Sequence, residues 1–315
     1  DQTRPTYAAI LPEEHRRAET RTFMTYPEWH IVHAYEDYAQ VIATGDPHDY
    51  GYVSSVTGFW GSLCALSKTS GEHGVIDWPT KRMVYVIGSS FTLELAAKAA
   101  YEETVGRLIT LMRGDDRAPL DDLSAKQADS YAEFLQQVPW FEWRWREDAA
   151  TLASDPADTL RDRERRFALG VEYGVKAAYA DALVKAMEGM EPDALTLRMV
   201  VTGLDAAAVT NFENVVLISE MAEGLELEAP RYRILTGILE AMSMDGAEFV
   251  EIAGNDDILF TALSDAPSHP DAMFSTPRQG FADHRHLITV PVSELADTLR
   301  GLDAAGLRLE HIHDY

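Results

Sequence analysis

Cysteine is nearly absent from this sequence of 315 residues, because Cys64 is the only one. A single thiol cannot form an internal disulfide or a thiolate cluster for zinc or iron–sulfur. Basic residues are also scarce: 27 lysines and arginines stand against 52 aspartates and glutamates, and no lysine follows Lys185. The formal net charge of −25 argues against a nucleic-acid partner and against adhesion to anionic lipid headgroups, since both carry phosphates.

Long apolar runs and familiar catalytic motifs are missing as well. The most apolar window, from Met83 to Met112, is interrupted by charged side chains and cannot span a bilayer. The sequence lacks GxGxxG, GxxxxGK[ST], GxSxG, HExxH and CxxCH. It therefore gives no support for a nucleotide cofactor, a serine hydrolase, an HExxH zinc protease or covalently attached haem.

Helical periodicity dominates from Pro27 to Met190, and shorter segments with strand character follow. This order predicts an α+β protein with an N-terminal arm at 1–25, a large, mainly helical domain at 26–190 and a ferredoxin-like α+β domain at 191–315. We expect the first helix to begin at Pro27. The last domain is predicted as β-α-β-β, a long loop and β-α-β, and the sequence shows no internal repeat.

One predicted helix, "YPEWHIVHAYEDYA", carries residues suited to metal chemistry. His30, His33 and Asp37 fall within about 60° of one another on a helix, away from its apolar stripe. Two imidazoles and a carboxylate on one face suit zinc or iron, or a proton relay, because histidine titrates near neutrality. The simpler alternative is a solvated or hydrogen-bonded helix face, since the sequence identifies no fourth ligand.

A charged pair interrupts the apolar stripe of a later helix. Lys98 and Glu102 are spaced i,i+4 on the face that should be buried. Buried charges need partners, so we predict that they pair with each other or with a facing helix. A buried lysine–glutamate pair could also serve acid–base catalysis, which leaves enzymatic activity an open question.

The segment "VPWFEWRWRED" alternates aromatic and charged side chains. Such alternation suits cation–π contacts with a protein partner, although packing between helices is its ordinary role. The candidate partner contacts are Trp140, Trp143, Arg144, Trp145 and Arg146.

Two histidine pairs lie near the C-terminus, His284 with His286 and His311 with His313. On a strand, residues i and i+2 share a face, so each pair could point in one direction. Four imidazoles would converge if the two strands were neighbours. The alternative is that the terminal pair is simply exposed.

Three segments together resemble a widespread uncharacterised family of membrane-anchored bacterial proteins: "RTFMTYPEWHIVHAYEDYA", "MVYVIGSSFTLELAAKAAYEETVGRL" and "YAEFLQQVPWFEWRW". The resemblance covers Arg21 to Arg146 and assigns no catalytic residue. It implies a hydrophobic anchor ahead of the helical body, and a soluble part on the periplasmic face of a membrane. A start at Asp1 without methionine and a basic first segment that includes Arg4 fit a removed anchor.

We therefore expect a non-catalytic, membrane-proximal binding or scaffold protein, as a subunit of a larger membrane-associated assembly. Its contact surfaces would be the tryptophan–arginine segment and the acidic C-terminal domain, facing a protein partner and not nucleic acid; homo-oligomerisation stays open. The alternative is a metal-dependent enzyme or metal carrier, with zinc or iron on His30, His33 and Asp37. Lys98 and Glu102 would then handle protons. An inward histidine face favours the alternative, and a solvated one excludes it.

Overall fold

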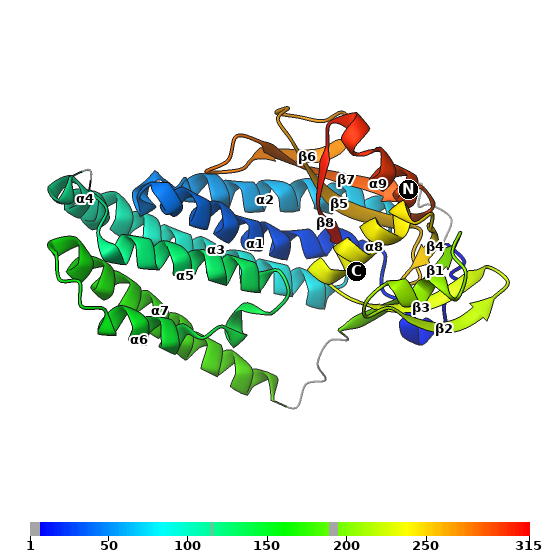
Figure 1. Cartoon of the computed structure of the whole chain (residues 1–315), viewed down its shortest axis with the longest axis horizontal. Helices are drawn as coiled ribbons and strands as arrows, with labels where there is room; N and C mark the ends of the chain where they lie inside the picture. The colour runs from blue at the N-terminus through cyan, green and yellow to red at the C-terminus, as the bar shows by residue number, and fades with distance from the viewer. Residues whose placement is uncertain (1–6, 115, 189–194) are drawn as a thin grey trace.

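The structure is a computed structural model that describes residues 7–114, 116–188 and 195–315. It confirms the α+β class: a long, mainly helical part is followed by two antiparallel four-stranded sheets. Figure 1 shows the helices as an elongated body on one side and the sheets at the other end. The predicted boundary between 190 and 191, and Arg4 in the arm, lie outside the described residues.

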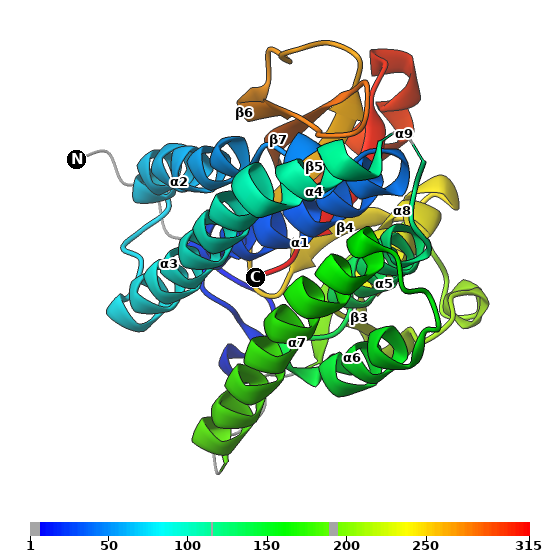
Figure 2. The ribbon, with the colours of Figure 1, turned by 90° about the vertical axis from the view of Figure 1, so that its left-hand side faces the viewer.

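The N-terminal part is a bundle arranged around its first helix, which contacts the second, third and fifth helices (Figure 2). Pro27 lies inside this helix, which begins earlier than predicted. In chain order the described helices are α1 (Thr20–Thr44), α2 (Tyr52–Thr69), α3 (Trp78–Tyr101), α4 (Arg107–Arg113), α5 (Pro119–Leu135), α6 (Trp145–Ser154) and α7 (Leu160–Met187).

A π-helical turn, Glu102–Gly106, joins α3 to α4. Glycine is required at its end, because a Cβ atom on Gly106 would lie 2.2 Å from Glu102 Oε2. The turn therefore allows the buried Glu102 side chain to fold back over the helix. Such turns insert one extra residue into a helical turn and often occur at functional sites.

The C-terminal part contains a structural repeat that the sequence does not reveal. Each unit runs strand–strand–strand–helix–strand, and its sheet has the same strand order in both cases, β2-β3-β1-β4 and β6-β7-β5-β8. The first unit is β1 (Thr196–Thr202), β2 (Val216–Met221), β3 (Gly224–Pro230), α8 (Arg233–Met244) and β4 (Glu248–Ile252). The second is β5 (Asp257–Ser264), β6 (Ala272–Pro277), β7 (His284–Pro291), α9 (Val292–Gly301) and β8 (Arg308–His313).

The strands and helices predicted in this part are present, and three strands were missed: β2, β3 and β6. The strand β3, "GLELEAP", was not predicted because it contains two glutamates, and glutamate is depleted in strands. Here Glu226 is buried and accepts a hydrogen bond of 2.7 Å from Arg198 on β1. In each unit a helix joins two strands that flank the unit's first strand, as in half of a ferredoxin-like fold.

Sheet β6-β7-β5-β8 lies between the two parts of the molecule. Phe260 and Ile312 point into the core of the C-terminal part, whereas Leu259 and Leu287 pack with α1 and α2. This alternation is the two-residue period of a strand buried on both faces. The arm also joins the C-terminal part, because the backbone N–H of Leu11 donates to Glu251 on β4 at 2.9 Å.

Candidate functional site

The face of α1 that carries the predicted metal residues turns inward. His30, His33 and Asp37 are all buried against α2 and the sheet β6-β7-β5-β8. They have separate partners, however: His30 Nε2 lies 2.9 Å from the carbonyl oxygen of Ser55, and Asp37 accepts a 2.9 Å hydrogen bond from the backbone N–H of Gln279. The predicted triad therefore does not meet at one point, and His33 alone faces β8.

His33 lies between two carboxylates from different parts of the chain. Its Nδ1 donates to Glu36 at 2.9 Å, and its Nε2 lies 3.7 Å from Glu310 Oε2. Arg285 of β7 holds Glu310 through two hydrogen bonds of 2.5 and 2.7 Å. We call these four residues, His33, Glu36, Arg285 and Glu310, the polar junction.

A β-bulge brings Glu310 to this position. On β8, His311 pairs with Thr261 and Leu309 pairs with Ala262, so Glu310 is an extra residue with no partner on β5. A bulge bends its strand and redirects a side chain that regular alternation would place on the other face. The glutamate can therefore reach α1, together with the histidines beside it.

Charge and burial together determine the pKa values at the junction. Burial raises the pKa of Glu310, but Arg285 and His33 outweigh it and lower that pKa to about 2. Burial raises the pKa of Asp37 to about 6, although Arg285 favours its charged form. Burial also lowers the pKa of His30 to about 3. Near neutral pH Glu310 is thus ionised, and His30, which lies outside the junction, is neutral.

Buried polar atoms without a hydrogen-bond partner are concentrated around the junction, within the described part of the chain. Such atoms are rare in proteins, and each needs an explanation such as a water molecule or an ion beside it. Those around the junction are Tyr26 Oη, His30 Nδ1, His33 Nε2, Asp37 Oδ1, His311 Nε2 and both ring nitrogens of His313; others, such as Thr110 Oγ1 and Trp145 Nε1, lie elsewhere.

The four C-terminal histidines do not converge, because β5 lies between β7 and β8. His311 and His313 belong to the surroundings of the junction, where the ring of His311 stacks on Trp29 with centroids 3.4 Å apart. His286 is buried elsewhere, between the hydroxyl groups of two serines. Each pair does lie on one strand, as predicted, but the four rings stay apart, and the terminal pair is buried and not exposed.

Two groups of described residues bring three potential metal ligands within reach of one cation. The first is His33 with Glu36 and Glu310. In the second, the same nitrogen of His73, Nδ1, lies 2.8 Å from Glu19 and 3.5 Å from Asp257. A single N–H facing two carboxylates is the geometry of an ion pair, whereas the first group uses both nitrogens of its histidine.

Lys98 and Glu102 do not pair with each other, and both interact with α7. Lys98 donates to Glu172 at 3.1 Å, and Glu102 accepts two hydrogen bonds of 2.9 and 3.0 Å from Arg165. Burial opposes ionisation of Glu172, but Lys98 and Lys176 lower its pKa to about 2. The facing-helix alternative is therefore the observed one, and it gives each charge a structural partner.

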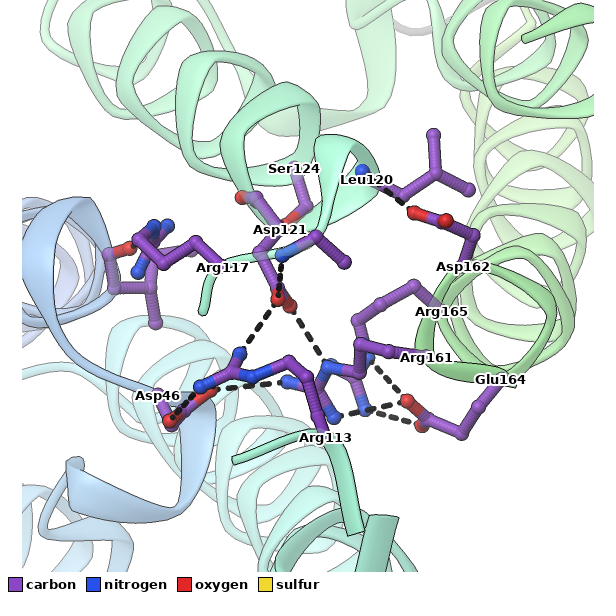
Figure 3. A network of polar contacts seen from close by, with 12 residues as sticks. Asp46, Arg113, Arg117, Leu120, Asp121, Ser124, Arg161, Asp162, Glu164 and Arg165 are labelled. Atoms are coloured by element: carbon purple, nitrogen blue, oxygen red, sulfur yellow. Dashed lines mark hydrogen bonds and ion pairs between the residues drawn. The ribbon is translucent and has the colours of Figure 1, made fainter. Parts of the chain in front are cut away.

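A second network of buried charges lies where α4, α5 and α7 meet the loop after α1, as Figure 3 shows. Arg161 donates to Asp121 at 2.8 Å and to Glu164 at 2.9 Å. Arg113 joins the same Asp121, at 2.6 Å, to Asp46, at 3.0 Å. Each of these charges has an opposite charge beside it, so the network serves to hold the helix ends together.

The tryptophan–arginine segment is mostly part of the interior. Trp143 and Trp145 are buried in the cluster around Tyr131, and Trp140 is half-buried. These two buried rings cannot provide the contact surface that the sequence suggested. Arg144 and Arg146 are exposed, and Arg146 pairs with Asp181.

The helical part instead exposes apolar side chains on α3 and α7. On α3 every exposed side chain from Met83 to Ala100 is uncharged, and the same holds on α7 from Phe167 to Ala178. We call these exposed residues the apolar face. They are Met83, Tyr85, Val86, Ser89, Leu93, Ala96, Ala97 and Ala100 on α3, and Phe167, Val171, Gly174, Val175 and Ala178 on α7.

A search of the described helices finds none with the length and apolar character needed to cross a membrane. Comparisons of the chain with protein-family models, with curated proteins and with solved structures gave no match.

Proposed function

We propose that this protein is a non-catalytic binding or scaffold protein at a membrane, and that its apolar face binds an apolar helix of a membrane-embedded partner. The observation that carries the proposal is the apolar face itself. Contiguous exposed apolar surface marks interaction sites in soluble proteins. Membrane proximity is our inference from the resemblance of the three N-terminal segments and is tested by the same experiment.

The helix α3 is apolar on two opposite faces. Leu95 packs inside the bundle at 4% exposed, whereas Leu93 on the other side is 72% exposed. A helix that is apolar all round is typical of a fully buried environment. We infer that something covers the outer face of α3 in the functional assembly.

The pattern on α7 favours a helix as the occupant. Phe167, Val171, Gly174, Val175 and Ala178 follow the i, i+4, i+7, i+8, i+11 spacing of a helix-packing stripe. A Cβ atom built on Gly174 meets nothing within 4 Å, so another backbone has room to approach closely there. Large side chains next to a small residue provide the ridge and groove that a second helix needs.

Charge argues for an uncharged partner and against a second copy of this chain. The apolar face offers no ion-pair partner, so electrostatic attraction would contribute little to recognition. A second copy would bring another net charge of −25 into contact with the first. The neighbouring helices α3 and α7, joined by the Lys98–Glu172 pair, lie on the same side of the bundle (Figure 2).

Site-specific photo-crosslinking in membranes of the source cell tests the proposal. A photoreactive benzoylphenylalanine would replace Leu93 or Val171, and Glu133, exposed on α5, would be the matched control. We expect both test positions, and not the control, to crosslink to the same membrane protein within an apolar helical segment. That segment, made as a peptide and inserted into neutral-lipid vesicles, should then recruit the purified chain.

Gly174→Glu places a charge in the centre of the apolar face without touching the folded interior. It should abolish both the crosslinks and the recruitment. Crosslinks only to other copies of this chain would replace the proposal by self-association. Recruitment that is unchanged by Gly174→Glu would show that the apolar face is not the binding surface.

A further inference from the structure

The geometry points to a divalent transition-metal site at the polar junction, with His33 Nε2 and Glu310 as ligands and Glu36 as the carboxylate that orients His33. The inference concerns a different part of the molecule from the apolar face and does not depend on the proposed function. It also differs from the metal site expected from the sequence, since it uses one residue of the expected triad and a carboxylate from β8.

The hydrogen bond to Glu36 determines which nitrogen of His33 is free. Nδ1 donates to the carboxylate of Glu36 at 2.9 Å, which leaves Nε2 as the nitrogen of His33 that can offer a lone pair to a metal ion. Nε2 is buried and has no hydrogen-bond partner. A histidine whose second nitrogen is held by a carboxylate is the common arrangement of metal-ligating histidines.

The spacing of Nε2 and Glu310 fits a shared cation. Their separation of 3.7 Å is too long for a hydrogen bond. Zinc binds histidine nitrogen and carboxylate oxygen at about 2.0–2.2 Å, which places two ligand atoms of a tetrahedral site roughly 3.4 Å apart. A shift of a few tenths of an ångström would therefore bring these two atoms to the spacing of ligands on one ion.

The surrounding charges permit a divalent ion. Glu36, Asp37 and Glu310 supply three carboxylates, against the guanidinium groups of Arg285 and Arg278. Each carboxylate oxygen has two lone pairs, so Glu310 can keep its bonds to Arg285 while it binds a cation. The side chains of Glu36 and Glu310 retain 19% and 10% exposure, which gives an ion in solution a route to the junction.

Two further side chains with polar atoms belong to the surroundings of the junction. Tyr26 Oη and both ring nitrogens of His313 are buried without hydrogen-bond partners. The Tyr26 and His313 rings lie 5.3 Å apart, and His313 interacts electrostatically with both His33 and Glu310. Imidazole and carboxylate together suit zinc, iron(II) or cobalt(II), whereas magnesium and calcium prefer oxygen alone.

Metal binding to the full-length chain tests the inference directly. The protein would be stripped with a chelator and titrated with Zn²⁺ in competition with a chromophoric chelator, and in parallel with Co²⁺ followed by its visible absorption. We expect one equivalent of tightly bound metal. His33→Ala and Glu310→Gln should remove it, and Glu36→Gln should weaken it by about 10–100-fold, as expected for a carboxylate that orients a ligand.

His73→Ala, in the other histidine–carboxylate group, is the matched control and should leave the stoichiometry unchanged. Circular dichroism verifies that each variant is folded. If His33→Ala does not fold, X-ray absorption of the Co²⁺-loaded wild type shows whether a histidine nitrogen is bound. Absence of stoichiometric metal, binding that persists in both ligand variants, or a metal shell of oxygen alone would overturn the inference.

Discussion

The two parts of this molecule differ in how they distribute apolar and charged side chains between the interior and the surface. The C-terminal part has a core of aliphatic and aromatic residues, such as Met199, Leu239 and Phe260, all essentially inaccessible to solvent. The helical part buries Arg161 and Arg165, whose side chains are 1% exposed, and exposes Phe167 and Leu93. Both parts bury some charges, such as Arg285 on β7, but among the described residues only the helical part combines its apolar clusters with ion networks between helices and an exposed apolar face.

The difference shows what each part is stabilised by. Each Å² of apolar surface removed from water contributes about 25 cal/mol. This burial is the main stabilising contribution in the C-terminal part. In the helical part, desolvation of the charges offsets much of their attraction, so the ion networks fix the positions of helices more than they stabilise them. The apolar face of the helical part is not packed within the chain, and the proposed function requires such a surface for association.

The largest change in stability predicted from this comparison follows the removal of one buried charge. Arg165→Ala leaves Glu102 without its two hydrogen bonds and Glu164 without one partner, in a site that water cannot reach. We expect the free energy of unfolding to fall by about 3–5 kcal/mol, measured by urea denaturation. Arg163→Ala, on the same helix and paired with Asp158 at the surface, should cost no more than about 1 kcal/mol.

Equal effects from these two variants would contradict the comparison, because they would show that burial of the Arg165 network contributes nothing. A double variant, Arg165→Met with Glu102→Met, tests the positioning role. Replacement of a buried pair by apolar residues of similar size is often neutral, so this variant should recover much of the lost stability.

Acid should destabilise the fold through the buried neutral histidines around the junction. Burial lowers the pKa of His30 to about 3 and the pKa values of His311 and His313 well below 6.5, so these rings bind protons only after unfolding. Their stabilising contribution is present above pH 6.5 and is lost as pH falls. Asp37 opposes this: burial raises its pKa to about 6, so its protonated form adds stability that is lost as pH rises through that value.

Near pH 5 the unfolded chain therefore binds three protons at these histidines, against one bound by folded Asp37. The net difference of two protons predicts that the free energy of unfolding falls by about 3 kcal/mol for each pH unit of acidification. Denaturation between pH 6 and 4.5, with chelator present, measures this slope. His313→Asn should halve the slope, and His269→Asn on the β5–β6 loop should leave it unchanged; a flat profile in the wild type would contradict the buried neutral histidines.

Sequence periodicity was enough to find α1, α2 and the α3–α4 rod, because their inner faces repeat with the helical period. It also placed Lys98 on a buried face, but it left open whether the histidine face of α1 turns inward. It named Asp37 as the carboxylate beside His33 and missed Glu36, although i+3 and i+4 both lie beside residue i on a helix. The structure places Glu36 on His33 and Asp37 on the backbone of Gln279.

Partners distant in sequence were beyond prediction. Glu310 reaches His33 only because of a bulge in β8, and a bulge leaves no reliable trace in a single sequence. Lys98 and Glu102 were expected to pair with each other or with a facing helix, and only the structure shows that α7 supplies both partners. The exposed stripe on α7 was not recognised, because an apolar stripe predicts burial and not exposure.

The smallest expected effect distinguishes inward from outward glycines in the helical part. In Gly88→Ala, on α3, the added Cβ would lie 2.3 Å from the ring of Phe59 on α2, and overpacking of this kind typically costs about 1–3 kcal/mol. In Gly174→Ala, on α7, the Cβ meets nothing within 4 Å, so the higher helix propensity of alanine should stabilise the isolated chain by up to about 1 kcal/mol.

Thermal unfolding of the two variants beside the wild type measures both the expected loss of stability in Gly88→Ala and the expected gain in Gly174→Ala. A destabilised Gly174→Ala variant would mean that α7 is already covered in the isolated chain, which would remove the basis for the apolar face as a binding surface. The expected increase in stability has a second consequence. The same methyl group should weaken recruitment by the partner helix, because it occupies the space through which the two backbones approach. A substitution that raises stability and lowers binding is the signature of a surface kept open for another molecule.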